Sequence, residues 1–374
     1  MMWLETESTV CIRPEALEVR ACQESMLRCD HYRSFGLYAE SLLRHEATGS
    51  ERSFLHRPNP ELASADGLGV ALRWLAVFIC CLLLVGCGGS TELPKLNVSD
   101  VKAWRLPIDG PKLPAPRSVV TGLDDEVIVL DDAGRVLVFD REGTVLRRWS
   151  MPDVSVGRPE GVVVLSDGRI VVCDTHYSQI TTFDRVGQVV NTFGKVGREV
   201  GEFIYPVAIT KDAQENLFVG EYGSNDRIQK FTSDGEHLLT FGSFGTEPGQ
   251  FQRPSGIVWL AGVVYVADSV NNRIQAFKDD GTFLKVIPIT HRGAAMPLHL
   301  PYDLALDAQD RLFIVEYGAG RLLQCTLEGE LLGALGKQGS SNGQFNTPWG
   351  ITVDSRGALR VADTGNRRLV AISR

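Results

Sequence analysis

A proline recurs along this chain at an almost constant interval, and this recurrence restricts the possible folds more than any other feature. Pro159, Pro206, Pro254, Pro301 and Pro348 follow one another every 47 or 48 residues, and Pro116 opens a less regular copy. A fixed period of this size indicates one supersecondary unit stacked against copies of itself. The period predicts architecture directly and chemistry only indirectly.

Each copy contains short runs of β-branched and aromatic residues separated by Gly, Asp and Asn. In the copy at Pro254 these runs are PSGIV, VVYVAD (263–268), NNRIQAF (271–277) and TFLKVI (282–287). This pattern is typical of strands joined by tight turns, and no long 3.6-residue apolar period competes with it. Four strands in a unit of this length predict one blade of an all-β propeller.

The last copy, at Pro348, ends after its third predicted strand. The missing fourth strand is predicted at the other end of the sequence, where VKAWRLP (101–107) resembles the outer strand TVLRRWSMP (144–152) of the first copy. We therefore predict that the amino-terminal strand completes the last blade, which pairs an otherwise open strand edge. The expected fold is a six-bladed β-propeller over residues 101–374.

These residues also resemble the NHL repeat. The pattern P-x-G-I-x-V, followed by V-A-D-x-x-N-x-R-I-Q-x-F and D-x-x-G-x-F, is fullest in residues 254–284 and 348–370. The resemblance implies a six-bladed propeller with a central channel. It implies no single activity, because propellers of this kind include binding modules, lyases and relatives of hydrolases.

The segment before the propeller predicts export and lipid attachment. Arg73 precedes the apolar run WLAVFICCLLLV (74–85), which is short for a membrane span, and Leu84-Val85-Gly86-Cys87 resembles a bacterial lipobox. We predict a lipoprotein signal peptide at 70–87, lipidation of Cys87 and a flexible tether at 88–100. Residues 1–69 precede this signal and are interpreted as a disordered or wrongly included extension.

These features place the predicted protein in a bacterial cell envelope, anchored by lipid, with the outer membrane facing the periplasm favoured. The formal net charge is −8. A mildly acidic chain lacks the basic surface expected of a nucleic-acid-binding propeller. The expected partner is an envelope protein or a glycan, contacted by a monomeric propeller.

An acid ends every second strand, and an arginine opens the third strand in all copies but one. The acids are Asp131, Asp174, Glu221, Asp268, Glu316 and Asp363, and the arginines are Arg135, Arg227, Arg273, Arg321 and Arg368. An acid and an arginine separated by one tight loop predict a charge-assisted pair that fixes the loop. We interpret this repeated pair as part of the scaffold.

The second blade departs from this pattern. Asp174 faces Gln179 in place of an arginine, across the loop Thr175-His176-Tyr177-Ser178. A carboxylate without its cation, next to a histidine and a tyrosine, makes Asp174, His176 and Tyr177 the candidate catalytic residues. The alternative is that Gln179 and backbone amides satisfy Asp174.

A second departure lies in the fifth blade, where Asp303 occupies a position that is small in the other copies. Loops that join second and third strands share a face with loops that lead into first strands, so one channel mouth should collect these groups. The candidate ligand-binding residues at this mouth are Glu160, Tyr222, Tyr302, Asp303, Tyr317 and Trp349. Aromatic and acidic groups there suit a carbohydrate, a peptide or a small organic ligand, although they also suit a protein contact surface.

Two functions remain open at this point. One is a binding or assembly module, which needs no cofactor. The other is a metal-assisted lyase or hydrolase, similar to amidating lyases or lactonases, with Zn²⁺ or Ca²⁺ at the mouth. His176 and His299 are its weak metal-ligand candidates, and three converging imidazoles of a zinc site are not visible in the sequence.

Overall fold

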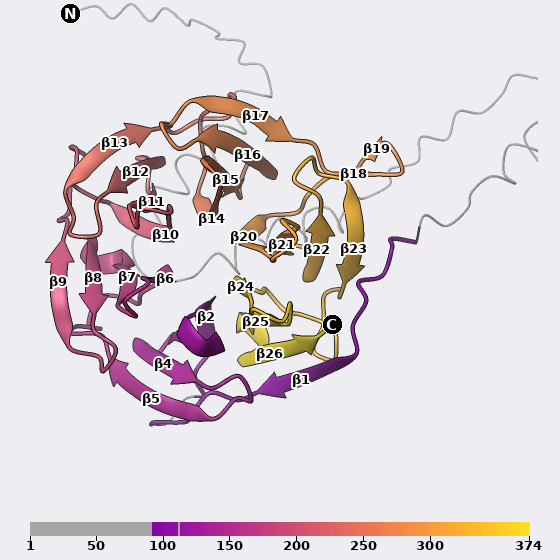
Figure 1. Ribbon diagram of the computed structural model, residues 1–374, viewed down its shortest axis with the longest axis horizontal. Helices are drawn as coiled ribbons and strands as arrows, with labels where there is room; N and C mark the ends of the chain where they lie inside the picture. Colours follow the sequence, from indigo (N-terminus) through magenta and orange to yellow (C-terminus); the bar gives the residue numbers. More distant parts are fainter. Residues whose placement is uncertain (1–91, 111–112) are drawn as a thin grey trace, which may run out of the picture. The chain divides into compact units, whose positions relative to one another are not determined.

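The computed structural model describes residues 92–110 and 113–374, and these form six four-stranded antiparallel sheets around a central channel (Figure 1). The predicted all-β, six-bladed propeller is confirmed. The predicted extension 1–69, signal peptide 70–87 and lipidation site Cys87 lie outside the described residues. No helix of the described part is long and apolar enough to span a bilayer.

Each blade is a meander whose first strand lines the channel and whose fourth strand lies at the rim (Figure 1). The second and third strands of blade one are continuous buried runs rich in β-branched residues, its outer strand alternates in exposure, and Gly and Asp close the turns between strands. The strands of the first three blades are β2 (Pro116–Thr121), β3 (Val127–Asp131), β4 (Arg135–Phe139), β5 (Val145–Ser150), β6 (Val162–Val164), β7 (Ile170–Asp174), β8 (Gln179–Phe183), β9 (Val189–Phe193), β10 (Tyr205–Lys211), β11 (Leu217–Tyr222), β12 (Arg227–Phe231) and β13 (His237–Phe241).

The other three blades follow the same order, and a small hairpin, β18 (Thr290–His291) with β19 (Ala294–Ala295), stands between blades four and five. Their strands are β14 (Pro254–Leu260), β15 (Val263–Asp268), β16 (Arg273–Lys278), β17 (Phe283–Ile287), β20 (Pro301–Leu306), β21 (Leu312–Glu316), β22 (Arg321–Cys325), β23 (Leu331–Leu335), β24 (Gly350–Val353), β25 (Leu359–Asp363) and β26 (Arg368–Ser373).

The sixth blade is completed from the amino-terminal side, as the sequence predicts. Strand β1 (Asp100–Trp104) pairs antiparallel with β26, from Asp100 opposite Ser373 to Trp104 opposite Leu369. The two ends of the propeller are therefore held together by backbone hydrogen bonds, which removes a free strand edge.

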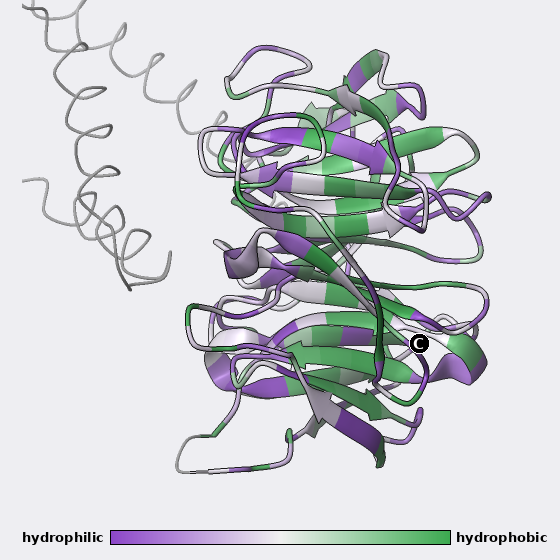
Figure 2. Ribbon diagram, turned by 90° about the vertical axis from the view of Figure 1, so that its left-hand side faces the viewer, coloured by the Kyte–Doolittle hydropathy of each residue, from purple (hydrophilic) through white to green (hydrophobic). Residues whose placement is uncertain are grey.

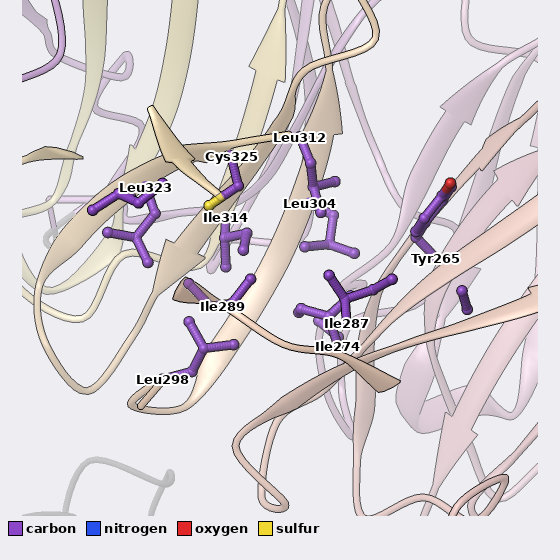
Figure 3. Close-up of a cluster of buried hydrophobic side chains, with 13 residues drawn as sticks. Tyr265, Ile274, Ile287, Ile289, Leu298, Leu304, Leu312, Ile314, Leu323 and Cys325 are labelled. Atoms are coloured by element: carbon purple, nitrogen blue, oxygen red, sulfur yellow. The ribbon is translucent and has the colours of Figure 1, made fainter. Parts of the chain in front are cut away.

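Hydrophobic residues follow the stacked strands, and many hydrophilic residues lie in the turns (Figure 2). The core lies between neighbouring blades. Figure 3 shows one such cluster, in which Tyr265 and Ile274 of blade four pack with Leu312, Leu323 and Cys325 of blade five. Each blade buries its two faces against its two neighbours, so no blade has a complete core alone.

The first strands approach one another closely around the channel. A Cβ atom at Gly256 would lie 2.6 Å from the Cα atom of Asp303 in the next blade, and one at Gly161 would lie 2.9 Å from the carbonyl oxygen of Val207. This close approach explains why most copies carry a small residue at this position.

Part of the predicted tether 88–100 is described, and it contacts the propeller. The Leu96 amide donates to the Ala334 carbonyl oxygen (2.8 Å), and the Ala334 amide donates to the Pro94 carbonyl oxygen (2.7 Å). Leu96 is buried against blades five and six. From Pro94 onward the chain therefore covers the outer edge of β23.

We predict that closure by β1 stabilises the whole ring through Trp104, whose ring packs beside Phe139 and below the Arg360 guanidinium. Replacing Trp104 with Ala should lower the free energy of unfolding by about 2 kcal/mol, less than a fully buried Trp, because the side chain is only half-buried. Chemical denaturation measures this. The matched control Lys102→Ala, at an exposed position of the same strand, should change it by less than about 0.5 kcal/mol. Equal effects of the two variants would contradict this role of Trp104.

Candidate functional site at the channel mouth

The starts of the first strands and the ends of the second strands lie at the same end of the channel. Pro116 is opposite Asp131 in blade one, and Pro301 is opposite Glu316 in blade five. The predicted common mouth is therefore present. The channel holds a cavity of about 190 Å³. In all six blades the residue that follows the recurring proline lines this cavity. These residues are Arg117, Glu160, Val207, Ser255, Tyr302 and Trp349.

A buried arginine crosses this mouth. Arg253, the residue before Pro254, has 8% of its surface exposed. Its Nη2 donates to the Tyr302 hydroxyl oxygen (2.7 Å) and lies 3.4 Å from Oε2 of Glu160, and its guanidinium carbon lies 4.2 Å from the centre of the Tyr222 ring. One side chain of blade four thus contacts blades two, three and five.

A second arginine extends this arrangement. Nη2 of Arg117 donates to Oε1 of Glu160 (2.6 Å), and the Arg117 guanidinium lies 4.5 Å from the centre of the Trp349 ring. The Trp349 ring stacks on the Tyr302 ring with centroids 5.3 Å apart, and the Tyr317 ring is tilted to the Tyr302 ring with centroids 5.7 Å apart.

We call these seven residues the mouth layer: Arg117, Glu160, Tyr222, Arg253, Tyr302, Tyr317 and Trp349. Burial raises the pKa of Tyr302 and of Tyr222, so both phenols stay protonated over the physiological range. The layer combines two guanidinium groups, one carboxylate and four aromatic rings.

The structure brings five of the six predicted ligand-binding residues into the mouth layer. The sixth, Asp303, lines the cavity itself, where its Oδ2 accepts from the Ile351 amide (2.9 Å) and its Oδ1 accepts from the Leu304 amide (2.8 Å). Burial raises the pKa of Asp303 to about 7 against these two hydrogen bonds. Asp303 therefore bridges blades five and six within the channel.

The two arginines of the layer are absent from the residues that the sequence predicted as ligand-binding. The one available signal for Arg253 is its place before the recurring proline, where other copies carry Ala115, Arg158, Tyr205, Leu300 and Thr347. Its place in the repeat does not predict the direction of the Arg253 side chain. The contact between Arg253 and Glu160 is therefore visible only in the structure.

The predicted acid–arginine pairs are present in five blades. The Nε-to-carboxylate distance is 2.6–2.8 Å in blades one, three, four and six, and Arg321 also pairs with Glu316 in blade five. In blades three, four and six the arginine also donates to backbone carbonyl oxygens of the loop that leads into the blade. These pairs fix the loops around the mouth, which supports their interpretation as scaffold.

Asp174 of blade two has no such pair. Its one hydrogen bond among the described residues comes from Nε2 of Gln179 to Oδ2 (3.2 Å), and Oδ1 is buried without a partner. Burial is the main cause that raises the pKa of Asp174 to about 6.

The other two candidate catalytic residues turn away from Asp174. His176 lies with Nδ1 3.3 Å from the backbone of Arg158 and packs beside the Tyr205 ring, and burial lowers its pKa. The Tyr177 hydroxyl accepts from the Val156 amide (2.9 Å) in the loop before the blade. The three side chains share one loop without converging on one point.

The two weak metal-ligand candidates lie in different blades. His176 belongs to blade two, whereas His299 is exposed beside blade five and donates its backbone amide to Oε1 of Glu316. Within residues 92–110 and 113–374, no group of three or more His, Cys, Asp or Glu side chains is placed to hold a metal ion.

Comparison with known proteins agrees with the repeat. The family model of the NHL repeat matches residues 157–183. This chain is a six-bladed propeller of NHL repeats. NHL repeat-containing protein 3 of Homo sapiens is 29% identical over 170 residues, which cover 41% of this chain and 48% of that protein. The Mus musculus protein of the same name is 28% identical over 249 residues, which cover 58% of this chain and 70% of that protein. The chain thus spans about half of the human relative's length.

Solved structures share the fold of this NHL propeller at low sequence identity. A streptogramin B lyase structure has a TM-score of 0.54 at 17% identity and covers 73% of this chain and 97% of its own. A gluconolactonase from Xanthomonas campestris has a TM-score of 0.53 at 16% identity and covers 74% of this chain and 98% of its own. At this identity the likeness shows the fold alone.

We predict opposite effects of the same substitution in two blades. Asp174→Asn at pH 8 should raise the free energy of unfolding by about 1 kcal/mol, because it removes a buried carboxylate with an unpartnered oxygen. Asp268→Asn should lower it by about 3 kcal/mol, because Arg273 loses its buried partner. Denaturant unfolding measures both, and destabilisation of equal size in the two variants would contradict the difference between the blades.

The effect of Asp174→Asn on the free energy of unfolding should depend on pH, because burial raises the pKa of Asp174. The folded protein holds this proton more tightly than an unfolded chain, whose Asp pKa is about 3.9. This contribution to stability is complete below about pH 4 and is lost as the pH rises to about 6. The gain from Asp174→Asn should therefore vanish at pH 4.

Proposed function

We propose that this NHL propeller is a binding module of the cell envelope whose mouth layer contacts a protein or glycan partner. The observation that carries the proposal is the mutual pairing of the charged groups in that layer. Glu160 accepts from Arg117 and faces Arg253, and Arg253 donates to Tyr302. Such groups hold one another in place, whereas a general acid or base must exchange its proton with a substrate.

The aromatic rings support the same proposal. Trp349 is half-buried, stacked on Tyr302 on one side and near Arg117 on another. A rigid aromatic and arginine surface loses little conformational entropy on binding, which is why such residues concentrate in binding hot spots. The layer therefore offers a prearranged surface to a sugar ring or to a protein side chain.

The envelope location rests on the lipobox at residues 84–87 and the apolar run before it. A lipid on Cys87 would attach the propeller to a membrane through the short segment that ends at β1. In this proposal a membrane-tethered propeller binds its partner at the channel mouth.

The alternative function is that of a metal-assisted lyase or hydrolase. This chain shares its fold with the streptogramin B lyase and gluconolactonase structures. Asp303 is its best placed residue, because it lines the cavity with a raised pKa. Metal analysis of the purified full chain separates the two functions, since a stoichiometric, tightly held Ca²⁺ or Zn²⁺ would favour the enzyme.

Site-specific photo-crosslinking tests the mouth as the binding surface. A photoreactive amino acid at position Trp349 should crosslink the partner in expressing cells, whereas the same group at Ser166, in the exposed turn at the opposite end of blade two, should not. The mass of the adduct distinguishes a protein from a glycan. Absence of adducts at Trp349, or equal adducts at both positions, would overturn the proposal.

Metabolic labelling tests the lipid anchor separately. A clickable palmitate analogue should label the processed protein in cells that express the full sequence, and Cys87→Ser should abolish the label because it removes the thiol that is proposed to carry the lipid. The control Cys173→Ala alters a thiol that is buried in blade two and should keep the label. Label that survives Cys87→Ser would contradict anchoring at this residue.

A further inference from the structure

Blade two lacks a guanidinium group that the rest of the ring contains. In blade four, Asp268 accepts from Nε of Arg273 (2.7 Å), from Nε2 of Gln275 (3.1 Å) and from the Gln252 amide (2.7 Å). Blade three repeats this set around Glu221. The fold thus builds a slot for one planar cation next to the acid that ends the second strand.

Blade two keeps the acid and changes two of the residues around it. Gln179 occupies the position of the arginine, and Thr181 occupies the position of the glutamine two residues later on the same face of the strand. Both side chains are shorter than those they replace. Two oxygens, Oδ1 of Asp174 and Oγ1 of Thr181, are buried without a hydrogen-bond partner among the described residues.

No cation of the described chain compensates Asp174. A second acid, Asp153, also raises the pKa of Asp174, because its negative charge disfavours the ionised carboxylate. Arg158 belongs to the loop before the blade, but its Nε donates to the Asp132 carbonyl oxygen (2.7 Å) and its Nη1 to the Gly157 carbonyl oxygen (2.8 Å). The slot therefore contains a carboxylate that no cation of the described residues neutralises, together with unused acceptor oxygens.

The slot lies close to the surface. The arginine side chains that fill it in blades three, four and six are 11%, 16% and 12% exposed. Gln179 is also partly exposed, although Asp174 is 1% exposed. A group that displaces the Gln179 side chain would reach the carboxylate along the path that arginine takes elsewhere.

We propose that this slot in blade two binds a guanidinium group supplied from outside the chain. The planar fork of a guanidinium matches a carboxylate with parallel N–H bonds, and Asp174 and Thr181 each offer a buried oxygen that has no partner among the described residues. A compact ammonium ion is more strongly hydrated and lacks this fork. The slot lies beside blade two's tight loop and is separate from the mouth layer, so it does not depend on the proposed function.

Calorimetric titration of the full chain at pH 8 tests this inference, because Asp174 is ionised there. The probes are N-acetylarginine amide, N-acetyllysine amide, agmatine and an arginine-containing tripeptide. The arginine derivative should bind at least about tenfold more tightly than the lysine derivative. Tighter binding of the tripeptide than of agmatine would identify an arginine of a partner protein as the source, and the reverse order a small guanidinium compound.

Two variants provide the controls. Asp174→Asn should abolish guanidinium binding, because it removes the anionic acceptor. Gln179→Arg restores the sequence pattern of the other five blades, so it should also abolish binding while raising the melting temperature, which shows that the protein remains folded. Binding that persists in either variant, binding without preference for arginine over lysine, or no binding of any probe would overturn the inference.

Discussion

The pairing of β1 with β26 is the interaction on which the rest of this structure depends. A propeller blade buries its faces against two neighbours, so every blade needs a closed ring to complete its core. Here the ring is closed by backbone hydrogen bonds between strands that lie 265 to 273 residues apart along the chain, from Trp104 opposite Leu369 to Asp100 opposite Ser373. Closure fixes the diameter of the channel and brings the six first strands close enough for side chains to meet across it.

The acid–arginine pair is the second constraint, and it acts locally. Each pair joins the end of a second strand to the start of a third, and in several blades to the loop that leads into the blade. Five of the six blades carry this pair, and blade two has Gln179 in place of the arginine. Comparison with the equivalent acids of the other blades shows which contacts Asp174 lacks.

Much of the fold could be predicted from the sequence, because it depends on spacing. The proline period gives the number of blades, the incomplete last copy predicts closure by the amino-terminal strand, and both are confirmed. The acid–arginine pairs were also predictable, since the two partners are four to six residues apart across one tight loop. The gathering of aromatic and acidic residues at one mouth followed from strand direction alone.

The directions of long side chains could not be predicted from the sequence. Arg253 contacts Glu160, 93 residues earlier, and Tyr302, 49 residues later. No periodicity encodes a contact across the channel, because it depends on the ring diameter and on competing partners at the mouth. The same holds for His176 and Tyr177, which share a loop with Asp174 but point elsewhere.

The sequence by itself therefore determined the blade count, the closure and the local ion pairs, since each arises from short-range spacing repeated along the chain. Only the tertiary structure decided which charges meet and which stay unpaired. That outcome depends on burial and on distances across the ring. The pKa values of Asp174 and Asp303 follow from it, because desolvation exists only once the blades have packed.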